Sequence, residues 1–224
     1  MTIDPNVFYG LAPKGRASLL GGLVGPPQPV TPKKYSSQEI LTEIRSIFSS
    51  HWEAREGRKV PEAEDVRLSN DGVTLRAAIL YADLVDSTGL VNRSTAKFAA
   101  EAYKAYLIGA CRVIKNNGGE IVAFDGDRVM AAFIDEFKNT SAARTAFQIH
   151  YIVRETNVAM KAVYGDGAVP LQHVTGIDTG ELLVARTGIR NSNDLVWVGP
   201  AANRAAKLCT IREAGYRTYI TAEV

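Results

Sequence analysis

From Thr74 onward the apolar residues recur with the periods of a strand, a helix, a hairpin, a second helix and a further strand. This order is typical of the ferredoxin-like βαββαβ arrangement. The hairpin is indicated by a link of only three residues, Asp125-Gly126-Asp127, between two short apolar runs. The predicted segments are a strand at 74–84, a helix from the cap Ser94 to Gly118-Gly119, strands at 120–124 and 128–133, and a helix at 141–159.

Shorter elements are predicted beyond the second long helix. They are strands at 171–177, 181–186 and 195–198, a helix at 200–211 and a last strand at 217–221. The sequence therefore predicts an α+β fold, with a ferredoxin-like core and C-terminal additions, over residues 74–224.

The region before this core divides into two parts. Residues 1–35 contain clustered Gly and Pro, notably LGGLVGPPQPV at 20–30, and predict a flexible arm. Residues 36–73 predict a helix followed by a polar connector, because Ser36 and Ser37 can cap a helix and apolar residues then recur on one face. That face packs either on its own domain or on the partner in a dimer, and the sequence leaves both open.

Composition excludes several classes of protein. The 224 residues carry 26 basic and 24 acidic side chains, a net charge of +2, so a nucleic-acid partner is not expected. No apolar run approaches the ~18 residues of a membrane span, and the start lacks a secretory signal, so we expect a soluble protein without a membrane partner. Cys111 and Cys209 fall in amphipathic helices, as buried thiols do, which fits a cytoplasmic location.

Two acidic residues could bind metal ions. Asp83 ends the first predicted strand and Asp127 lies at the tip of the hairpin. Those strands are neighbours in a ferredoxin-like sheet, so both carboxylates should reach one edge. Such a pair suits Mg²⁺, and two metals ~4 Å apart can hold the attacking oxygen and the departing phosphate of an in-line displacement. On these two residues alone a structural role is the stronger interpretation, because Asp is common at strand ends and in turns.

Four ordered motifs resemble those of the class III adenylate and guanylate cyclases. YADLVDSTGL (81–90) stands at the first metal motif of that family, GGEIVAFDGDRVMAAF (118–133) at the second, GIDTGELLV (176–184) at its hairpin and VGPAANRAAKL (198–208) at its catalytic helix. The resemblance covers residues 75–224, about two thirds of the chain, and implies the class III cyclase fold.

The resemblance also implies the metal site and the assembly. Asp83 and Asp127 would bind two Mg²⁺ or Mn²⁺ ions, with the Leu84 carbonyl as a further ligand. Each active site of the family lies between two subunits, one giving the aspartates and the other the catalytic helix, which implies a symmetric homodimer with two equivalent sites. The substrate would be a nucleoside triphosphate.

The catalytic helix of the family is represented here by two residues. Asn203 matches the asparagine that orients the ribose, and Lys207 stands where the family has an arginine that neutralises the transition state. A spacing of four keeps both on one helix face, but lysine supplies a point charge in place of a bidentate fork. Arg204 is one residue off that face and is the weaker candidate. Without the resemblance, Asn203 and Lys207 would be an ordinary solvated helix face.

The positions that would contact the base depart from the purine pattern. Purine-using members place a lysine four residues before the second metal aspartate and an acidic or hydroxyl residue seven before the asparagine, and these positions are Ala123 and Val196 here. Neither can hydrogen-bond a base edge, so ATP and GTP become doubtful substrates. Tyr81 and Asp194 lie on the corresponding strand faces and are candidate base contacts. Packing of a buried tyrosine and a solvent-facing aspartate are the alternatives.

Three segments most resemble the pyrimidine cyclases of bacterial Pycsar antiphage systems: LYADLVDSTGLV, FDGDRVMAAFI and ARTGIRNSNDLVWVGPAANRAAKL. This resemblance implies conversion of UTP to 3′,5′-cyclic UMP and pyrophosphate, with the product signalling to a separate effector protein. Cytidylate or adenylate cyclase activity and a catalytically inactive nucleotide sensor remain alternatives. A palm-type polymerase domain also sets two aspartates on such a sheet, but the basic, aromatic-rich surface that tracks a strand is missing from the sequence.

Overall fold

The computed structural model describes residues 34–224, so the arm predicted over residues 1–35 lies almost wholly outside the described residues. The chain divides into two compact units after Thr42, and all strands of the described chain belong to the second unit, Glu43–Val224. Among residues 34–224 there is no helix with the length and apolar character needed to cross a bilayer.

Helix α1 (Ser37–Ser49) begins where the sequence predicts it. The Ser36 hydroxyl accepts a hydrogen bond from the Glu39 amide at 3.3 Å, and the Glu39 carboxylate accepts one from the Ser36 amide at 2.8 Å. This reciprocal capping box satisfies amides that the first turn leaves unpaired. No residue of α1 is buried, and its apolar side chains, Ile40, Leu41, Ile44, Ile47 and Phe48, are exposed.

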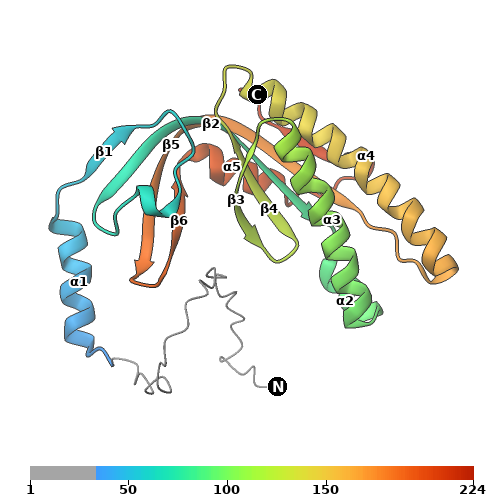
Figure 1. The fold of residues 1–224 in the computed structure, drawn as a ribbon, viewed down its shortest axis with the longest axis horizontal. Helices are drawn as coiled ribbons and strands as arrows, with labels where there is room; N and C mark the ends of the chain where they lie inside the picture. The colour runs from blue at the N-terminus through green and yellow to red at the C-terminus, as the bar shows by residue number, and fades with distance from the viewer. Residues whose placement is uncertain (1–33) are drawn as a thin grey trace, which may run out of the picture. The chain divides into compact units, whose positions relative to one another are not determined.

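The strands of the described chain form one sheet in the order β3-β4-β2-β5-β6 (Figure 1). Strand β1 lies beside β2, and β7 lies beside β5. Neighbouring strands in this order are antiparallel. Strand β1 pairs with β2 in parallel, and β7 pairs with β5 in parallel. The strands are β1 (Glu53–Glu56), β2 (Asp71–Leu84), β3 (Glu120–Asp125), β4 (Arg128–Phe133), β5 (His173–Ile189), β6 (Ser192–Val198) and β7 (Thr218–Ile220).

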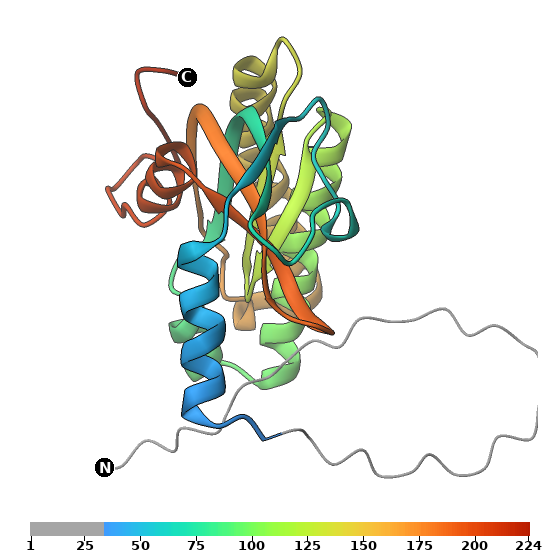
Figure 2. The ribbon, with the colours of Figure 1, turned by 90° about the vertical axis from the view of Figure 1, so that its left-hand side faces the viewer.

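The long helices cover one face of this sheet and α5 covers the other (Figure 2). The order β2-α3-β3-β4-α4-β5 is the predicted βαββαβ core, which the structure confirms. The helices are α2 (Ser87–Arg93), α3 (Ala96–Asn116), α4 (Lys138–Tyr164) and α5 (Pro200–Leu208), with short 3₁₀ turns η1 (Ala63–Asp65) and η2 (Gly165–Gly167).

Strand β2 is the centre of both apolar layers. Leu80 and Ala82 pack in the cluster under α3 and α4, whereas Ile79 packs in a second cluster with Ala201 and Ala205 of α5. A strand buried on both faces has a nearly continuous apolar sequence, and β2 has this pattern from Ala77 to Ala82. Since alternate residues share a face, the residues in register with Ile79, including Asp83, emerge on the side of α5.

The structure corrects several predicted boundaries. The two strands predicted at 171–177 and 181–186 are one strand, β5, of 17 residues. Its ladder with β2 continues through Gly180, which pairs with Ala77. Helix α4 extends to 27 residues, longer than the predicted 141–159. Elements β1 and α2 were not predicted, and β1 pairs with β2 in the same sheet.

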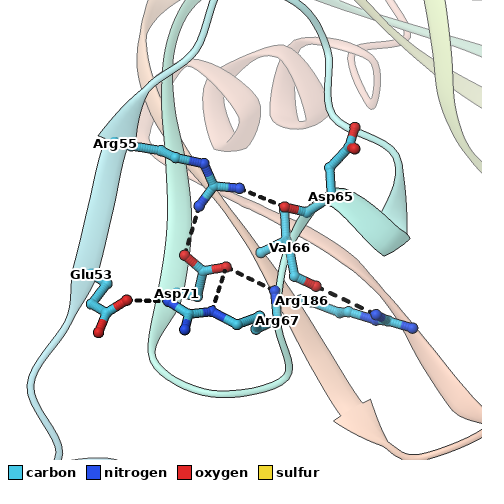
Figure 3. Close-up of polar contacts among 7 residues, drawn as sticks. All are labelled: Glu53, Arg55, Asp65, Val66, Arg67, Asp71 and Arg186. Atoms are coloured by element: carbon cyan, nitrogen blue, oxygen red, sulfur yellow. Dashed lines mark hydrogen bonds and ion pairs between the residues drawn. The ribbon is translucent and has the colours of Figure 1, made fainter.

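The start of β2 is fixed by a buried carboxylate (Figure 3). Asp71 is 2% exposed, and its oxygens accept hydrogen bonds from Arg55 Nη1 at 2.7 Å and from the Arg67 amide at 2.8 Å. Burial alone would raise the pKa of Asp71, but the Arg67 amide and the two guanidinium charges outweigh it and the net pKa is lowered. This end of β2 therefore carries a fully paired charge.

Candidate active site

The structure brings Asp83 and Asp127 to the same edge of the sheet. Asp83 is the second-last residue of β2, and Asp127 lies in the turn between β3 and β4. Gly126 in this turn has φ +62°, a left-handed conformation that favours glycine and allows the three-residue link. Because Ala82 pairs with Val129, Asp83 comes level with the turn that carries Asp127.

The electrostatics of this edge indicate a site for a cation. Burial raises the pKa of Asp83, and the neighbouring charge of Asp127 raises it further. Asp127 Oδ2 is buried and has no hydrogen-bond partner among the described residues. An unpaired buried carboxylate oxygen is costly, so the residues present fit a divalent cation, which would satisfy both groups.

The donor set is small. Within residues 34–224 there is no group of three or more His, Cys, Asp or Glu side chains placed to hold a metal ion. A cation at this edge would therefore rely on two carboxylates and complete its shell with water, substrate oxygens or a backbone carbonyl such as that of Leu84, the last residue of β2. Mg²⁺ and Mn²⁺ both accept such an all-oxygen shell.

Two arginines that the sequence reasoning did not select also face Asp83. Arg212, in the loop after α5, places Nη2 3.6 Å from Asp83 Oδ2, while its Nη1 donates to the Cys209 carbonyl at 2.7 Å. Arg128 donates to Asp125 at 2.6 Å, and its guanidinium lies 5.5 Å from the centroid of the Tyr81 ring. Both guanidinium charges act to lower the pKa of Asp83, without overcoming its burial and Asp127.

Two of the four positions of the predicted base pocket lie close to the carboxylates. Tyr81 and Ala123 both pair with Met130 of β4, so the three form one row across the sheet on the Asp83 face. Burial raises the pKa of Tyr81, and the side chain is half-buried beneath Arg128.

The other two positions of the predicted base pocket, Val196 and Asp194, lie far from the carboxylates within one chain. Val196 pairs with Ala185 of β5, whereas Asp83 pairs with Val174, eleven residues away and roughly 35 Å of strand length. Asp194 is exposed and lines a cavity of about 440 Å³ with residues of the connector and β3, including Lys59 and Glu120. Within one chain, Asp194 and Val196 therefore do not join the carboxylates.

Helix α5 turns Asn203 and Lys207 away from the sheet. Ala201, Ala202 and Ala205 of α5 are buried, and both Asn203 and Lys207 are exposed on the other side. No ion pair or side-chain hydrogen bond joins either residue to Asp83 or Asp127 in the part of the chain that the structure describes. Arg204, the weaker candidate, is engaged instead by Asp178 of β5, whose Oδ2 accepts a hydrogen bond from Arg204 Nε at 2.5 Å.

Known proteins share both this sequence and this fold. A uridylate cyclase from Xanthomonas perforans is 49% identical over 189 residues, which cover 83% of this chain and 80% of the relative. A uridylate cyclase from Burkholderia cepacia is 49% identical over 190 residues, which cover 84% and 82%. This chain belongs to the uridylate cyclase family. No protein-family model matches it.

The fold of this uridylate cyclase family member is that of the class III cyclases. The adenylyl cyclase CyaB from P. aeruginosa superposes with a TM-score of 0.57 at 24% identity, over 67% of this chain and 79% of that chain. The resemblance stated from the sequence motifs is therefore confirmed, and the chain is a nucleotide cyclase, a phosphorus–oxygen lyase.

Proposed function

We propose that this protein converts UTP to 3′,5′-cyclic UMP and pyrophosphate. The ribose 3′-oxygen attacks the α-phosphorus, the bond from that phosphorus to the bridging β-oxygen breaks, pyrophosphate leaves and the hydroxyl proton passes to water. The observation that carries the proposal is the convergence of Asp83 with Asp127, whose Oδ2 is buried and unpaired. The substrate is suggested by relatives that are named uridylate cyclases.

Asp83 and Asp127 would hold two Mg²⁺ or Mn²⁺ ions, with the Leu84 carbonyl as a further ligand. Bound cations would supply the positive charge that favours deprotonation of the 3′-hydroxyl and holds the triphosphate. Arg212 and Arg128 lie beside the same carboxylates, so their charges are available to the triphosphate and the base once cations neutralise Asp83. No protein base is required in this scheme.

A symmetric homodimer would complete each site. Asn203 would orient the ribose and Lys207 would neutralise developing charge, both from the subunit opposite the one that gives the aspartates. The exposure of both side chains on the outer side of α5 supports this division, because residues that serve a partner must be accessible in the single chain. Asp194 and Val196 would likewise reach a base only from the opposite subunit.

Selection of the base would follow from what lies around Tyr81. Ala123 and Val196 cannot hydrogen-bond a base edge, and leaving a purine edge unpaired costs about 1–3 kcal/mol per buried group. Tyr81 stays the candidate base contact on the aspartate side, and Arg128 over its ring adds the guanidinium donors that Asp125 does not occupy. A pyrimidine base is smaller than a purine base and would leave room for the side chains of Tyr81 and Arg128.

The product would serve as a second messenger of antiphage defence, read by a separate cyclic-nucleotide-binding effector in the cytoplasm. This part of the proposal rests on the resemblance of the sequence motifs to Pycsar cyclases, whereas the relatives named uridylate cyclases support the product alone. The two cysteines, Cys111 and Cys209, are unpaired, which fits a reducing compartment.

The test is incubation of the purified protein with each of the four ribonucleoside triphosphates and Mg²⁺ or Mn²⁺, with products identified by mass spectrometry. We expect cyclic UMP to dominate. Turnover of CTP alone or ATP alone would show that this nucleotide, and not UTP, is the substrate. Absence of any product from a protein shown to be dimeric would favour the inactive sensor.

A further inference from the structure

Helix α5 rests on alternate residues of β5. Gly176, Asp178 and Gly180 share one face of the strand, the face that meets α5. A Cβ atom at Gly176 would lie 2.2 Å from the Ala205 carbonyl oxygen, and one at Gly180 would lie 3.4 Å from the Ala201 Cβ. The glycines therefore let the helix approach the strand closely, and Asp178 is the side chain between them.

Asp178 joins three segments of the chain. It is 0% exposed, and its Oδ2 accepts a hydrogen bond from Arg204 Nε on α5 at 2.5 Å. Its Oδ1 accepts hydrogen bonds from the Thr179 amide at 2.8 Å and from Thr221 Oγ1, just after β7, at 2.5 Å. A buried charge is tolerated only when it is paired and hydrogen-bonded, and this one is fully engaged.

The other attachments of α5 are weaker than the bond from Arg204 to Asp178. Its N-cap, Gly199, has no side-chain capping hydrogen bond, and its buried residues are three alanines. The residue that caps its C-terminus, Cys209, is also buried, and its thiol donates to the Tyr81 and Val174 carbonyls at 3.5 and 3.2 Å. Alanine side chains make few contacts and a thiol is a weak donor, so these attachments resist a small rotation of α5 only weakly. The charge-assisted bond from Arg204 to Asp178 is short and directional, and it fixes the helix where packing alone does not.

We propose that Asp178 is a positioning residue for cyclisation. Through Arg204 it sets the rotation and register of α5, and so the places at which Asn203 and Lys207 enter the active site that the other subunit completes. The proposal rests on the two-subunit site described under Proposed function. Asp178 touches no substrate in this scheme, so its loss acts only through α5.

The first experiment replaces Asp178 with Asn, which keeps the shape and turns an acceptor into a possible donor against Arg204. We expect kcat to fall about 10- to 100-fold, the effect of a displacement of roughly 1 Å at reacting groups. Dimerisation by light scattering and the rise in Tm on adding Mn²⁺ should stay at wild-type values, because the aspartate half is untouched. Asp166→Asn, the same change at an exposed carboxylate, should leave kcat unchanged.

A complementation test then asks which half of the site Asp178 serves. Heterodimers are purified through two different tags, one on each subunit. Asp178→Asn paired with Asp127→Asn leaves one intact site per dimer, and about half of wild-type activity should return. Asp178→Asn paired with Asn203→Ala damages α5 in both sites, so activity should stay low. Asp127→Asn paired with Asn203→Ala is the control for the shared site and should also recover about half.

The pairings separate the possible failures. Should the control pair recover no activity, the shared site is wrong and the proposal loses its basis. A second failure is that the control pair recovers activity, but Asp178→Asn is rescued by Asn203→Ala and not by Asp127→Asn. That pattern would show that Asp178 serves the aspartate half of the site, and it would overturn the positioning role. Arg204→Met, at a half-exposed side chain, must give the same pattern of rescue even if Asp178→Asn folds poorly. Full kcat in both variants would also overturn the proposal.

Discussion

Strand β2 carries a carboxylate near each end, and their surroundings differ. Asp71, at the start, lies between Arg55 and Arg67, and its pKa is lowered. Asp83, close to the other end, is half-buried beside Asp127, and its pKa is raised by that burial and by the second carboxylate. Arg212 approaches Asp83 only to 3.6 Å.

The comparison separates a charge that is paired within the fold from one that the fold leaves uncompensated. Both carboxylates lose hydration on folding, but only the Asp71 site supplies enough donors and positive charge to compensate. The Asp83 and Asp127 pair is left short of compensation, and a divalent cation would supply it. Undercompensated acidic residues at the edge of a sheet are thus a sign of a site that a ligand completes.

Replacing Asp127 with Asn should have the largest effect on activity. Loss of one cation ligand removes several kcal/mol of transition-state stabilisation, so we expect kcat/KM to fall about 10³-fold. The rise in Tm on adding Mn²⁺ should also disappear, because it reports binding to the native state. Cyclase assays and differential scanning fluorimetry measure the two effects. Wild-type activity in Asp127→Asn would show that the carboxylate is not a metal ligand.

Replacing Asp71 with Asn should have the opposite profile. The change removes the buried charge that both arginines contact. The guanidinium groups stay partly exposed and Arg67 keeps its ion pair with Glu53, so the free energy of unfolding should fall by about 2 kcal/mol. Activity per folded molecule should stay near wild type, because the far end of β2 is unaffected. Urea denaturation followed by circular dichroism gives the loss, and Asp166→Asn serves as the exposed control. An unchanged unfolding midpoint would mean that the arginines do not stabilise this end.

The parts of the fold that depend on local sequence patterns could be predicted from the sequence, whereas the parts that depend on contacts between distant segments could not. Strand β2 and the hairpin could be predicted because both depend on local patterns, a continuous apolar run and a three-residue turn with glycine. Strand β5 was predicted as two strands because Asp178 and Gly180 resemble a turn in isolation. In the fold, Gly180 pairs with Ala77 and admits α5, a reason that lies in another part of the chain.

The residues of the candidate site also divide into those that local patterns predict and those that depend on distant contacts. Asp83 and Asp127 could be predicted because one ends a predicted strand and the other lies in the predicted hairpin turn, and the expected strand order then placed them together. Arg212 and the Asp178–Arg204 pair could not, because both depend on where the segment around α5 lies on the sheet. A motif shows which residue types are present, but it does not show which of them meet across the sheet.

Acid should weaken the Asp71 end. A carboxyl group whose folded pKa lies below its unfolded value of 3.8 contributes stability above that pH and loses it as the pH falls through the folded pKa. The difference in unfolding free energy between wild type and Asp71→Asn should therefore be constant from pH 7 to about 5 and shrink below about 4. Urea titrations across this range test the sign. A difference that grows on acidification would contradict the lowered pKa.

Replacing Asp83 with Asn in metal-free buffer should have the smallest effect, and its sign should oppose that of Asp71→Asn. A carboxylate whose pKa is raised destabilises the fold at neutral pH, so neutralising it should raise Tm slightly, by about 2 °C. The Arg212 pair lost in this variant lies near solvent and contributes little to stability. Added Mn²⁺ should reverse the order, because only the wild type gains stability from binding. Destabilisation of Asp83→Asn without metal, as large as that of Asp71→Asn, would show that the two ends of β2 are compensated alike.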